Sequence, residues 1–95
     1  MAGLTTHVLD TSKGKPASNL KIELFKISQS EKNLIGTFFT NKDGRIDGPL
    51  ISADELEETN YELLFFAGDY LKKDKINLNK NLFLDQIPIR FRISN

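Results

Sequence analysis

The chain lacks cysteine and tryptophan, and it has one histidine and one methionine among its 95 residues. Without cysteine it can form no disulfide, no thiolate nucleophile and no cysteine-ligated metal site. Because small secreted domains often carry disulfides, this absence favours a reducing compartment. No apolar stretch approaches the roughly 18 residues of a membrane span, and no basic region followed by an apolar run opens the chain. We therefore expect a soluble, cytoplasmic protein without a signal peptide or membrane partner.

An excess of charge of one sign is also missing. Lys and Arg together number 13, as do Asp and Glu, so the formal net charge is zero. Nucleic acids and anionic membranes attract proteins with a positive field, so neither is expected as a partner. A chain of 95 residues has room for one core, and we expect a single domain over residues 1–95. A small domain buries only roughly 60–70% of its unfolded surface, so partner subunits could add to its stability.

What the sequence does have is a series of short β-strand patterns separated by turn residues. Alternating or dense β-forming residues predict strands over 4–10, 19–27, 34–40, 61–67 and 86–94, with a short strand at 45–47. Asp43-Gly44 predicts a tight reversal, because glycine supplies the positive φ that such a turn needs. Pro88 indicates the start of a strand or an edge strand. Short strands with little helix predict an antiparallel β-sandwich.

Apolar residues that share a strand face define the predicted core: Ile22, Leu24, Leu63, Phe65, Ile89 and Phe91. Four phenylalanines are interpreted as core rather than as a stacking platform: Phe38, Phe39, Phe65 and Phe66. Polar connections are predicted at 28–33 and 73–81. Helix is limited to one turn at the capping-box spacing of Ser52 and Glu55, and a brief helix that Asp69 caps, through Lys72.

The common catalytic and ligand motifs are missing. There is no Gly-x-Ser-x-Gly elbow, no phosphate loop and no zinc-ligand spacing. Four acidic residues are better explained as a solvated helix start than as a carboxylate cluster: Asp54, Glu55, Glu57 and Glu58. Arg90 and Arg92 are most simply the wet face of the last strand, although they could bind an anion. These patterns by themselves indicate no enzyme class.

His7 and Arg45 are the two residues for which a chemical role is considered. His7 lies in the middle of a predicted strand, where a base that titrates near neutral pH could serve acid–base catalysis. The alternative is a polar side chain that faces solvent from a half-exposed sheet, and spacing alone favours this alternative. Arg45 follows a turn, and its planar donor fork suits a carboxylate or a heterocyclic carbonyl.

A series of motifs along the chain resembles one protein family. The segment His7-Val8-Leu9-Asp10, followed by Gly14, Pro16-Ala17, Leu20 and Ile22, resembles the N-terminal signature of the transthyretin family. His7 stands where the hormone carriers typically have lysine and the enzymes of the family, the 5-hydroxyisourate hydrolases, have histidine. Further landmarks are similar to the enzyme branch: Thr40-Asn41, Asp43-Gly44-Arg45, Gly48-Pro49-Leu50, Tyr61-Glu62-Leu63, Gly68-Asp69-Tyr70, Phe83-Leu84-Asp85 and Pro88-Ile89-Arg90-Phe91.

The resemblance implies an all-β, transthyretin-like (prealbumin-like) antiparallel β-sandwich with one short helix. It also implies hydrolysis of 5-hydroxyisourate, a product of urate oxidation in purine catabolism, by water attack on a ring carbonyl without a metal or organic cofactor. Catalytic and substrate-binding roles carry over to His7, which would activate water, and to Arg45, which would hold the substrate. The family forms homotetramers in which His7 would line the channel between subunits. The alternative is a non-catalytic binding or structural module, or an inactive fragment of the hydrolase.

The resemblance implies two further strands, which carry another histidine and a tetrapeptide similar to Tyr-Arg-Gly-Ser, and residues 1–95 contain no match to them. We therefore expect an incomplete sandwich. At about 25 cal/mol per Å², a few hundred Å² of uncovered apolar surface costs several kcal/mol, against a total stability of roughly 5–15 kcal/mol.

The purified 95-residue chain should accordingly bind hydrophobic dyes, melt early or aggregate, and hydrolyse 5-hydroxyisourate poorly. Dye fluorescence, a thermal melt and an activity assay test this expectation. A sharp, reversible melt from a fully active monomer would contradict it.

Overall fold

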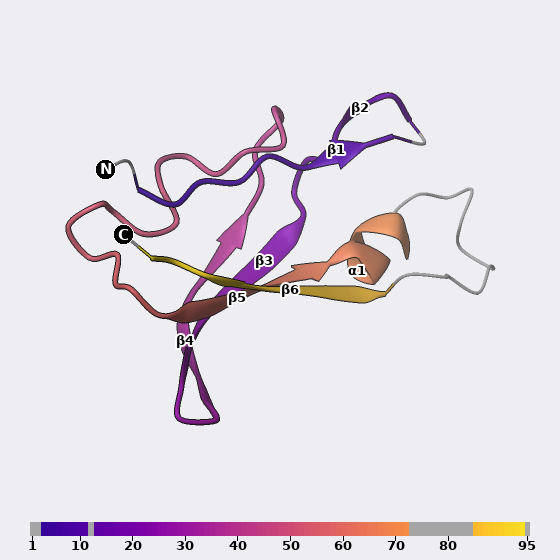
Figure 1. The fold of residues 1–95 in the computed structure, drawn as a ribbon. Helices are drawn as coiled ribbons and strands as arrows, with labels where there is room; N and C mark the ends of the chain where they lie inside the picture. Colours follow the sequence, from indigo (N-terminus) through magenta and orange to yellow (C-terminus); the bar gives the residue numbers. More distant parts are fainter. Residues whose placement is uncertain (1–2, 12, 73–84, 95) are drawn as a thin grey trace.

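The computed structural model describes residues 3–11, 13–72 and 85–94, so the predicted connection at 73–81 lies outside the described residues. Its elements are β1 (Leu9–Asp10), β2 (Lys15–Pro16), β3 (Lys21–Ser28), β4 (Glu31–Phe39), β5 (Asn60–Phe66), α1 (Ala67–Lys72) and β6 (Gln86–Arg92). One sheet has the strand order β4-β3-β5-β6, and a second contains β1 and β2 (Figure 1). All the pairings are antiparallel, which confirms the predicted all-β class with one short helix.

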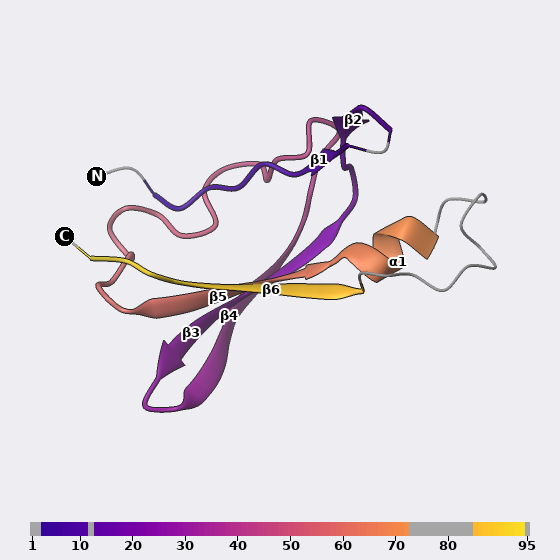
Figure 2. The same cartoon turned by 45° about the vertical axis from the view of Figure 1, so that its right-hand side comes forward.

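The N-terminal segment and the loop between β4 and β5 lie together over one face of the four-stranded sheet (Figure 2). Ile22 and Leu24 of β3 pair with Phe65 and Leu63 of β5, so the apolar side chains of both strands point toward this layer. Leu50 and Ile51 of the loop join the same buried cluster, and Leu4 and Val8 pack against it. The cluster consists of Leu20, Ile22, Leu24, Leu50, Ile51, Tyr61 and Leu63. The core therefore lies between the sheet and the layer of loops.

The predicted core is confirmed except at one position. Ile22, Leu24 and Leu63 are buried, and Phe65 and Phe91 pack against them partly buried. Ile89, however, is 48% exposed. It pairs with Leu63 and so shares the inner face, but β6 is the edge strand and the overlying layer leaves this position half uncovered.

The phenylalanine prediction is wrong at Phe39, which is 55% exposed. Phe38 packs against the core, so the next residue along the strand faces the opposite side of the sheet. Phe66 also lies on that outer side, partly buried, with the Lys21 ammonium 4.7 Å from its ring centroid. On this face the two aromatic rings do not belong to the core.

The hairpin between β3 and β4 is longer than the sequence predicts. The polar stretch expected as a connection is strand up to Ser28 and again from Glu31, and only Gln29 and Ser30 form the turn. Both turn residues have positive φ, 48° and 72°, as a two-residue type I′ reversal needs. The hairpin projects away from the rest of the molecule (Figure 1), so both its faces meet water and polar residues suit it. The exposure of both faces explains why the polar composition of this hairpin is typical of a loop.

The predicted strand at 4–10 is regular only at Leu9–Asp10, and the one at 45–47 does not form. The N-terminal segment instead makes two isolated bridges to the loop, Leu4 with Ile51 and His7 with Arg45. Between the two bridged loop positions lies Gly48-Pro49, where proline has no backbone N–H to extend a ladder. The loop therefore offers the N-terminal segment hydrogen bonds at its two ends only.

The short helical predictions are confirmed in part. The amide N–H of Leu56 donates to the Ser52 carbonyl at 3.1 Å, and the Ser52 hydroxyl donates to Glu55 at 2.9 Å, but residues 53–55 form a turn that does not continue as a helix. Helix α1 begins at Ala67, two residues before the predicted cap, so Asp69 lies in its first turn. Its carboxylate still lies at the helix end where a negative charge is favourable.

The outer face of the sheet is tied together by Glu62, which is only 4% exposed. Its carboxylate accepts hydrogen bonds from Arg90 Nε at 2.8 Å and from Lys32 Nζ at 3.1 Å, so β5 is linked to both edge strands. These hydrogen bonds and charges, that of Arg90 foremost, outweigh burial and hold the pKa of the Glu62 carboxyl below its usual 4.5. Arg90 is thus engaged in an ion pair rather than only solvated.

Replacement of Glu62 by Gln should lower the free energy of unfolding by about 1 kcal/mol near neutral pH, because both cations stay half exposed to water. Since the folded-state pKa is depressed, the carboxylate stabilises the fold above its unfolded pKa and the contribution is lost as the pH falls through the folded value. Urea denaturation at neutral and acid pH should show the gap between wild type and Glu62→Gln closing on acidification. Glu23→Gln, on the same face, is the control. A gap that does not depend on pH would contradict this account.

Gly44 determines how closely the turn after β4 approaches the N-terminal segment. Its φ is 77°, its carbonyl accepts the Val8 N–H at 2.9 Å, and a Cβ at this position would overlap the carbonyl oxygen of Val8. Gly14 has a similar φ of 64° but open space around it. The two glycines therefore separate backbone strain from close packing.

Gly14→Ala should cost about 1 kcal/mol in the free energy of unfolding, the strain of a left-handed alanine. Gly44→Ala should cost at least about twice as much, because the backbone must also move away from Val8. Urea denaturation of both variants measures the difference. Equal losses would mean that the close approach contributes nothing.

Candidate functional site

His7 and Arg45 face each other across the antiparallel bridge between the N-terminal segment and the turn after β4. Residues directly opposite in an antiparallel pair project their side chains to the same side. Both residues are exposed, whereas Thr6, Val8 and Ile46 beside them are partly buried. Val8 and Ile46 pack against the core, so His7 and Arg45 lie on the outer surface of the layer of loops. The structure thus brings the two predicted site residues together.

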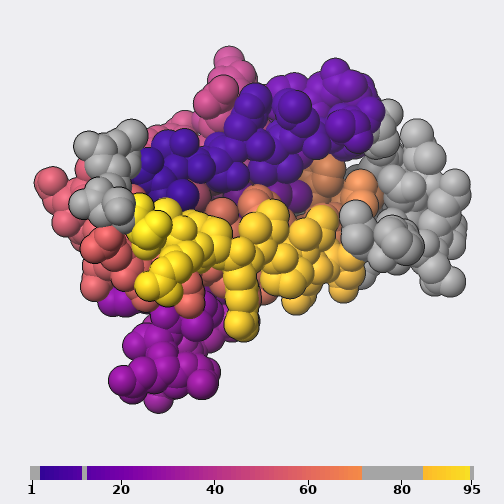
Figure 3. Space-filling view, viewed as in Figure 1, coloured from indigo at the N-terminus to yellow at the C-terminus, as the bar shows by residue number. Residues whose placement is uncertain are grey.

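The N-terminal segment carries His7 at the molecular surface. Figure 3 shows this segment (indigo) running along the surface above β6 (yellow). Two backbone hydrogen bonds fix it next to His7: the Val8 N–H donates to Gly44 at 2.9 Å, and the Val8 carbonyl accepts from Ala17 at 3.0 Å. The position of His7 therefore depends on contacts with two separate turns, not on a regular strand.

The turn that carries Arg45 stands on a buried threonine. Thr40 is 4% exposed; its hydroxyl donates to the Ala17 carbonyl at 2.7 Å and accepts the Leu20 N–H at 2.9 Å. The following residue, Asn41, exchanges backbone hydrogen bonds with the turn, because its N–H donates to Arg45 at 2.7 Å and its carbonyl accepts from Gly44 at 2.9 Å. The end of β4 is thereby locked to the start of β3, and Arg45 emerges from a rigid base.

Asn41 also contributes its side chain, which the sequence analysis did not consider. Its Oδ1 accepts the N–H groups of Asp43 at 2.8 Å and Arg45 at 3.2 Å, and its Nδ2 donates to Asp47 Oδ1 at 2.8 Å. The signal that could have indicated this is Asn at the first position of an Asx turn, two residues before Asp43-Gly44. The contact with Asp47 has no such local signal.

Within the described residues, neither the imidazole of His7 nor the guanidinium of Arg45 takes part in a hydrogen bond or ion pair of the structure. An exposed guanidinium of this kind can donate two parallel hydrogen bonds to an anion or a planar carbonyl. An exposed imidazole can accept a proton from water. The bridge therefore sets an exposed histidine opposite an exposed arginine.

A cluster of metal ligands and a membrane-spanning helix are both absent from residues 3–11, 13–72 and 85–94. These ranges contain no group of three or more His, Cys, Asp or Glu side chains that could hold a metal ion. Their one helix, α1, spans Ala67–Lys72, and no helix in the ranges has the length and apolarity to cross a membrane. Acidic residues that were predicted as a solvated stretch form no metal-ligating group here.

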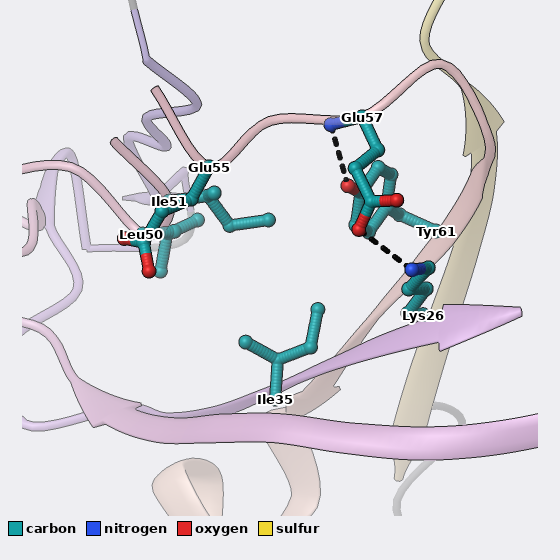
Figure 4. Close-up of a pocket in the computed structure, with 7 residues that line it drawn as sticks. All are labelled: Lys26, Ile35, Leu50, Ile51, Glu55, Glu57 and Tyr61. Carbon is teal, nitrogen blue, oxygen red and sulfur yellow. Dashed lines mark hydrogen bonds and ion pairs between the residues drawn. The ribbon is translucent and has the colours of Figure 1, made fainter. Parts of the chain in front are cut away.

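A different hollow lies between β3, β4 and the loop before β5 (Figure 4), with a volume of about 240 Å³. Lys26 Nζ binds Glu57 Oε2 at 2.6 Å there, which raises the pKa of the lysine, and the Glu57 N–H donates to the Tyr61 hydroxyl at 3.0 Å. Ile35, at the β-bulge of β4, forms the opposite wall. In this hollow the charges of Lys26 and Glu57 are paired with one another, and neither predicted site residue lines it.

A larger cavity of about 360 Å³ lies between β1, α1 and β6 and is lined mainly by apolar side chains, among them Val8, Leu20 and Ile87. At its margin the Tyr70 hydroxyl donates to Asp10 Oδ2 at 2.8 Å. His7 and Arg45 do not line it. They lie on the outer side of the segment whose inner side, at Val8, faces this cavity.

The sequence matches the model of the HIUase/Transthyretin family over residues 4–95. It is 46% identical to 5-hydroxyisourate hydrolase 2 of Rhizobium meliloti over 92 residues, which is 97% of this chain and 77% of the relative. It is 48% identical to 5-hydroxyisourate hydrolase of Mesorhizobium japonicum over 88 residues, 93% of this chain and 71% of the relative.

The structure resembles that of Klebsiella pneumoniae 5-hydroxyisourate hydrolase with a TM-score of 0.79 at 27% identity, over 100% of this chain and 81% of that one. The sequence match spans the N-terminal segment, the turn with Arg45 and all four strands of the larger sheet. Sequence and fold agree with the resemblance read from the motifs, and the chain therefore belongs to the HIUase/Transthyretin family.

Proposed function

We propose that this chain is a 5-hydroxyisourate hydrolase, in which His7 and Arg45 act on one bound substrate. The observation that carries the proposal is the bridge that pairs these two residues, both exposed on one side of the layer. Relatives of 46% and 48% identity are 5-hydroxyisourate hydrolases, which supports the substrate assignment. No cofactor is required for the chemistry proposed.

His7 acts as the general base in this proposal. Its imidazole takes a proton from water as the water oxygen bonds to a ring carbonyl carbon of the substrate. The ring C–N bond then breaks and the departing nitrogen takes up a proton, so that the ring opens to a carboxylate. General base catalysis of this kind contributes typically about 10²–10⁴-fold.

Arg45 holds a carbonyl of the substrate and acts as the oxyanion binder. As water attacks, negative charge develops on the carbonyl oxygen, and a guanidinium fixed in advance stabilises that charge without reorganisation. The hydrogen bonds of Thr40 and Asn41 hold the backbone from which this guanidinium projects. One oriented donor typically contributes about 10²–10³-fold.

Three further features are part of the proposal: one domain over residues 1–95, from the chain length, a cytoplasmic location, from the lack of cysteine, and a homotetramer, from the family. Neither His7 nor Arg45 lines the two cavities described above, of about 240 and 360 Å³. A water-excluding pocket around the pair would therefore need a wall from other segments or from a neighbouring subunit. Assembly into an oligomer supplies such a wall.

Replacement of His7 or Arg45 by Ala in the full-length protein should each lower kcat for freshly generated 5-hydroxyisourate by about 10²-fold or more, since each removes one catalytic interaction. Both side chains are exposed, so the free energy of unfolding should change by less than about 0.5 kcal/mol. The absorbance decay of the substrate measures the rate. Arg92→Ala, at an exposed residue of β6, is the control. Near wild-type turnover by either His7→Ala or Arg45→Ala would refute the assigned roles.

A further inference from the structure

Arg45 can bind a substrate through its guanidinium only if that group is not already paired with a neighbouring acid. Asp47 lies two residues further along the chain, and Arg45 and Asp47 are both exposed while Ile46 between them is partly buried. Both side chains are therefore open to solvent two residues apart, and a carboxylate and a guanidinium so near in sequence are natural ion-pair partners. Such a pair would compete directly with a substrate for the donors of Arg45.

The structure shows Asp47 bound elsewhere. Its Oδ1 accepts a hydrogen bond from Asn41 Nδ2 at 2.8 Å, and no ion pair joins Asp47 to Arg45 within the described residues. The same amide group uses its Oδ1 to accept from the N–H groups of Asp43 and Arg45. One side chain therefore does two separable things: its oxygen closes the turn, and its nitrogen holds the carboxylate.

We propose that Asn41 keeps Arg45 available for substrate by holding the carboxylate of Asp47. This inference rests on the proposed function, because it assigns Arg45 to substrate binding; Asn41 itself is a positioning residue and touches no substrate. A hydrogen bond from a neutral amide to a carboxylate is comparable in strength with an exposed ion pair. Loss of the amide donor therefore shifts Asp47 toward Arg45.

The roles of the two ends of the Asn41 side chain can be separated by Asn41→Asp. Aspartate has the same shape and keeps an acceptor oxygen for the N–H groups of Asp43 and Arg45, so the turn is retained. It has no N–H donor, and its negative charge repels Asp47. In the exchanged pair Asn41→Asp with Asp47→Asn, the donor and acceptor change places and the hydrogen bond can form again.

Steady-state kinetics of the full-length protein with 5-hydroxyisourate test the inference. Asn41→Asp should raise KM about fivefold with little change in kcat, the competition that an exposed ion pair exerts. Asp47→Asn alone should leave KM unchanged, and the exchanged double variant should return KM to within about twofold of wild type. A purely structural role of Asn41 would instead lower the melting temperature, leave KM unchanged and show no recovery in the double variant.

A second measurement does not depend on activity. Solvent exchange of the Arg45 Nε–H proton, followed by NMR, should be as fast in wild type as that of exposed Arg92, slower in Asn41→Asp, and fast again in the double variant. If the exchange rates follow this pattern in a protein without hydrolase activity, the proposed function is refuted, but the Asn41–Asp47 contact is still established as what keeps Arg45 unpaired. An active wild type in which Asn41→Asp changes neither KM nor the exchange rate would overturn the inference.

Discussion

The contact on which the rest of the structure depends is the close approach of Gly44 to Val8. A backbone hydrogen bond of 2.9 Å joins them, and the missing Cβ of glycine leaves room for it. This one contact holds the N-terminal segment against the turn after β4, places His7 opposite Arg45 and draws Val8 onto the core. Because the segment makes only isolated bridges to the loop rather than a ladder, the other backbone hydrogen bond beside His7 is the one that the Val8 carbonyl accepts from Ala17.

The four-stranded sheet provides the fixed base for this arrangement. Glu62 ties the central strand to both edges, and buried Thr40 locks the end of β4 to the start of β3. The site is therefore carried by loops that stand on a rigid sheet, a common division of labour between binding residues and scaffold. The hydrogen bonds of Asn41 connect Thr40 to the backbone of Arg45, so the point from which the guanidinium projects is set before any ligand arrives.

The ion pairs of the described residues lie away from the site and do not include Arg45. Lys26 is matched by Glu57, and Arg90 and Lys32 by Glu62, whereas the guanidinium of Arg45 makes no such pair within the described residues. Asp47, the acid nearest to it in the sequence, is held by Asn41. A positive group that is left unpaired on a rigid turn can bind an anion or a polarised carbonyl at little cost in rearrangement.

The sequence by itself determined what depends on local periodicity and turn residues: the strand faces that bury Ile22, Leu24 and Leu63, and the tight turn at Gly44. For Pro88 it left the start of a strand or an edge strand open, and the structure shows the edge strand. The pairing of His7 with Arg45 followed from the family resemblance, because no local pattern relates residues so far apart. Only the tertiary structure decided the half-exposure of Ile89, the outward position of Phe39, the loss of regular strand in the N-terminal segment and the contact of Asn41 with Asp47. Each of these depends on which segment of the chain happens to lie opposite, and periodicity carries no information about that partner.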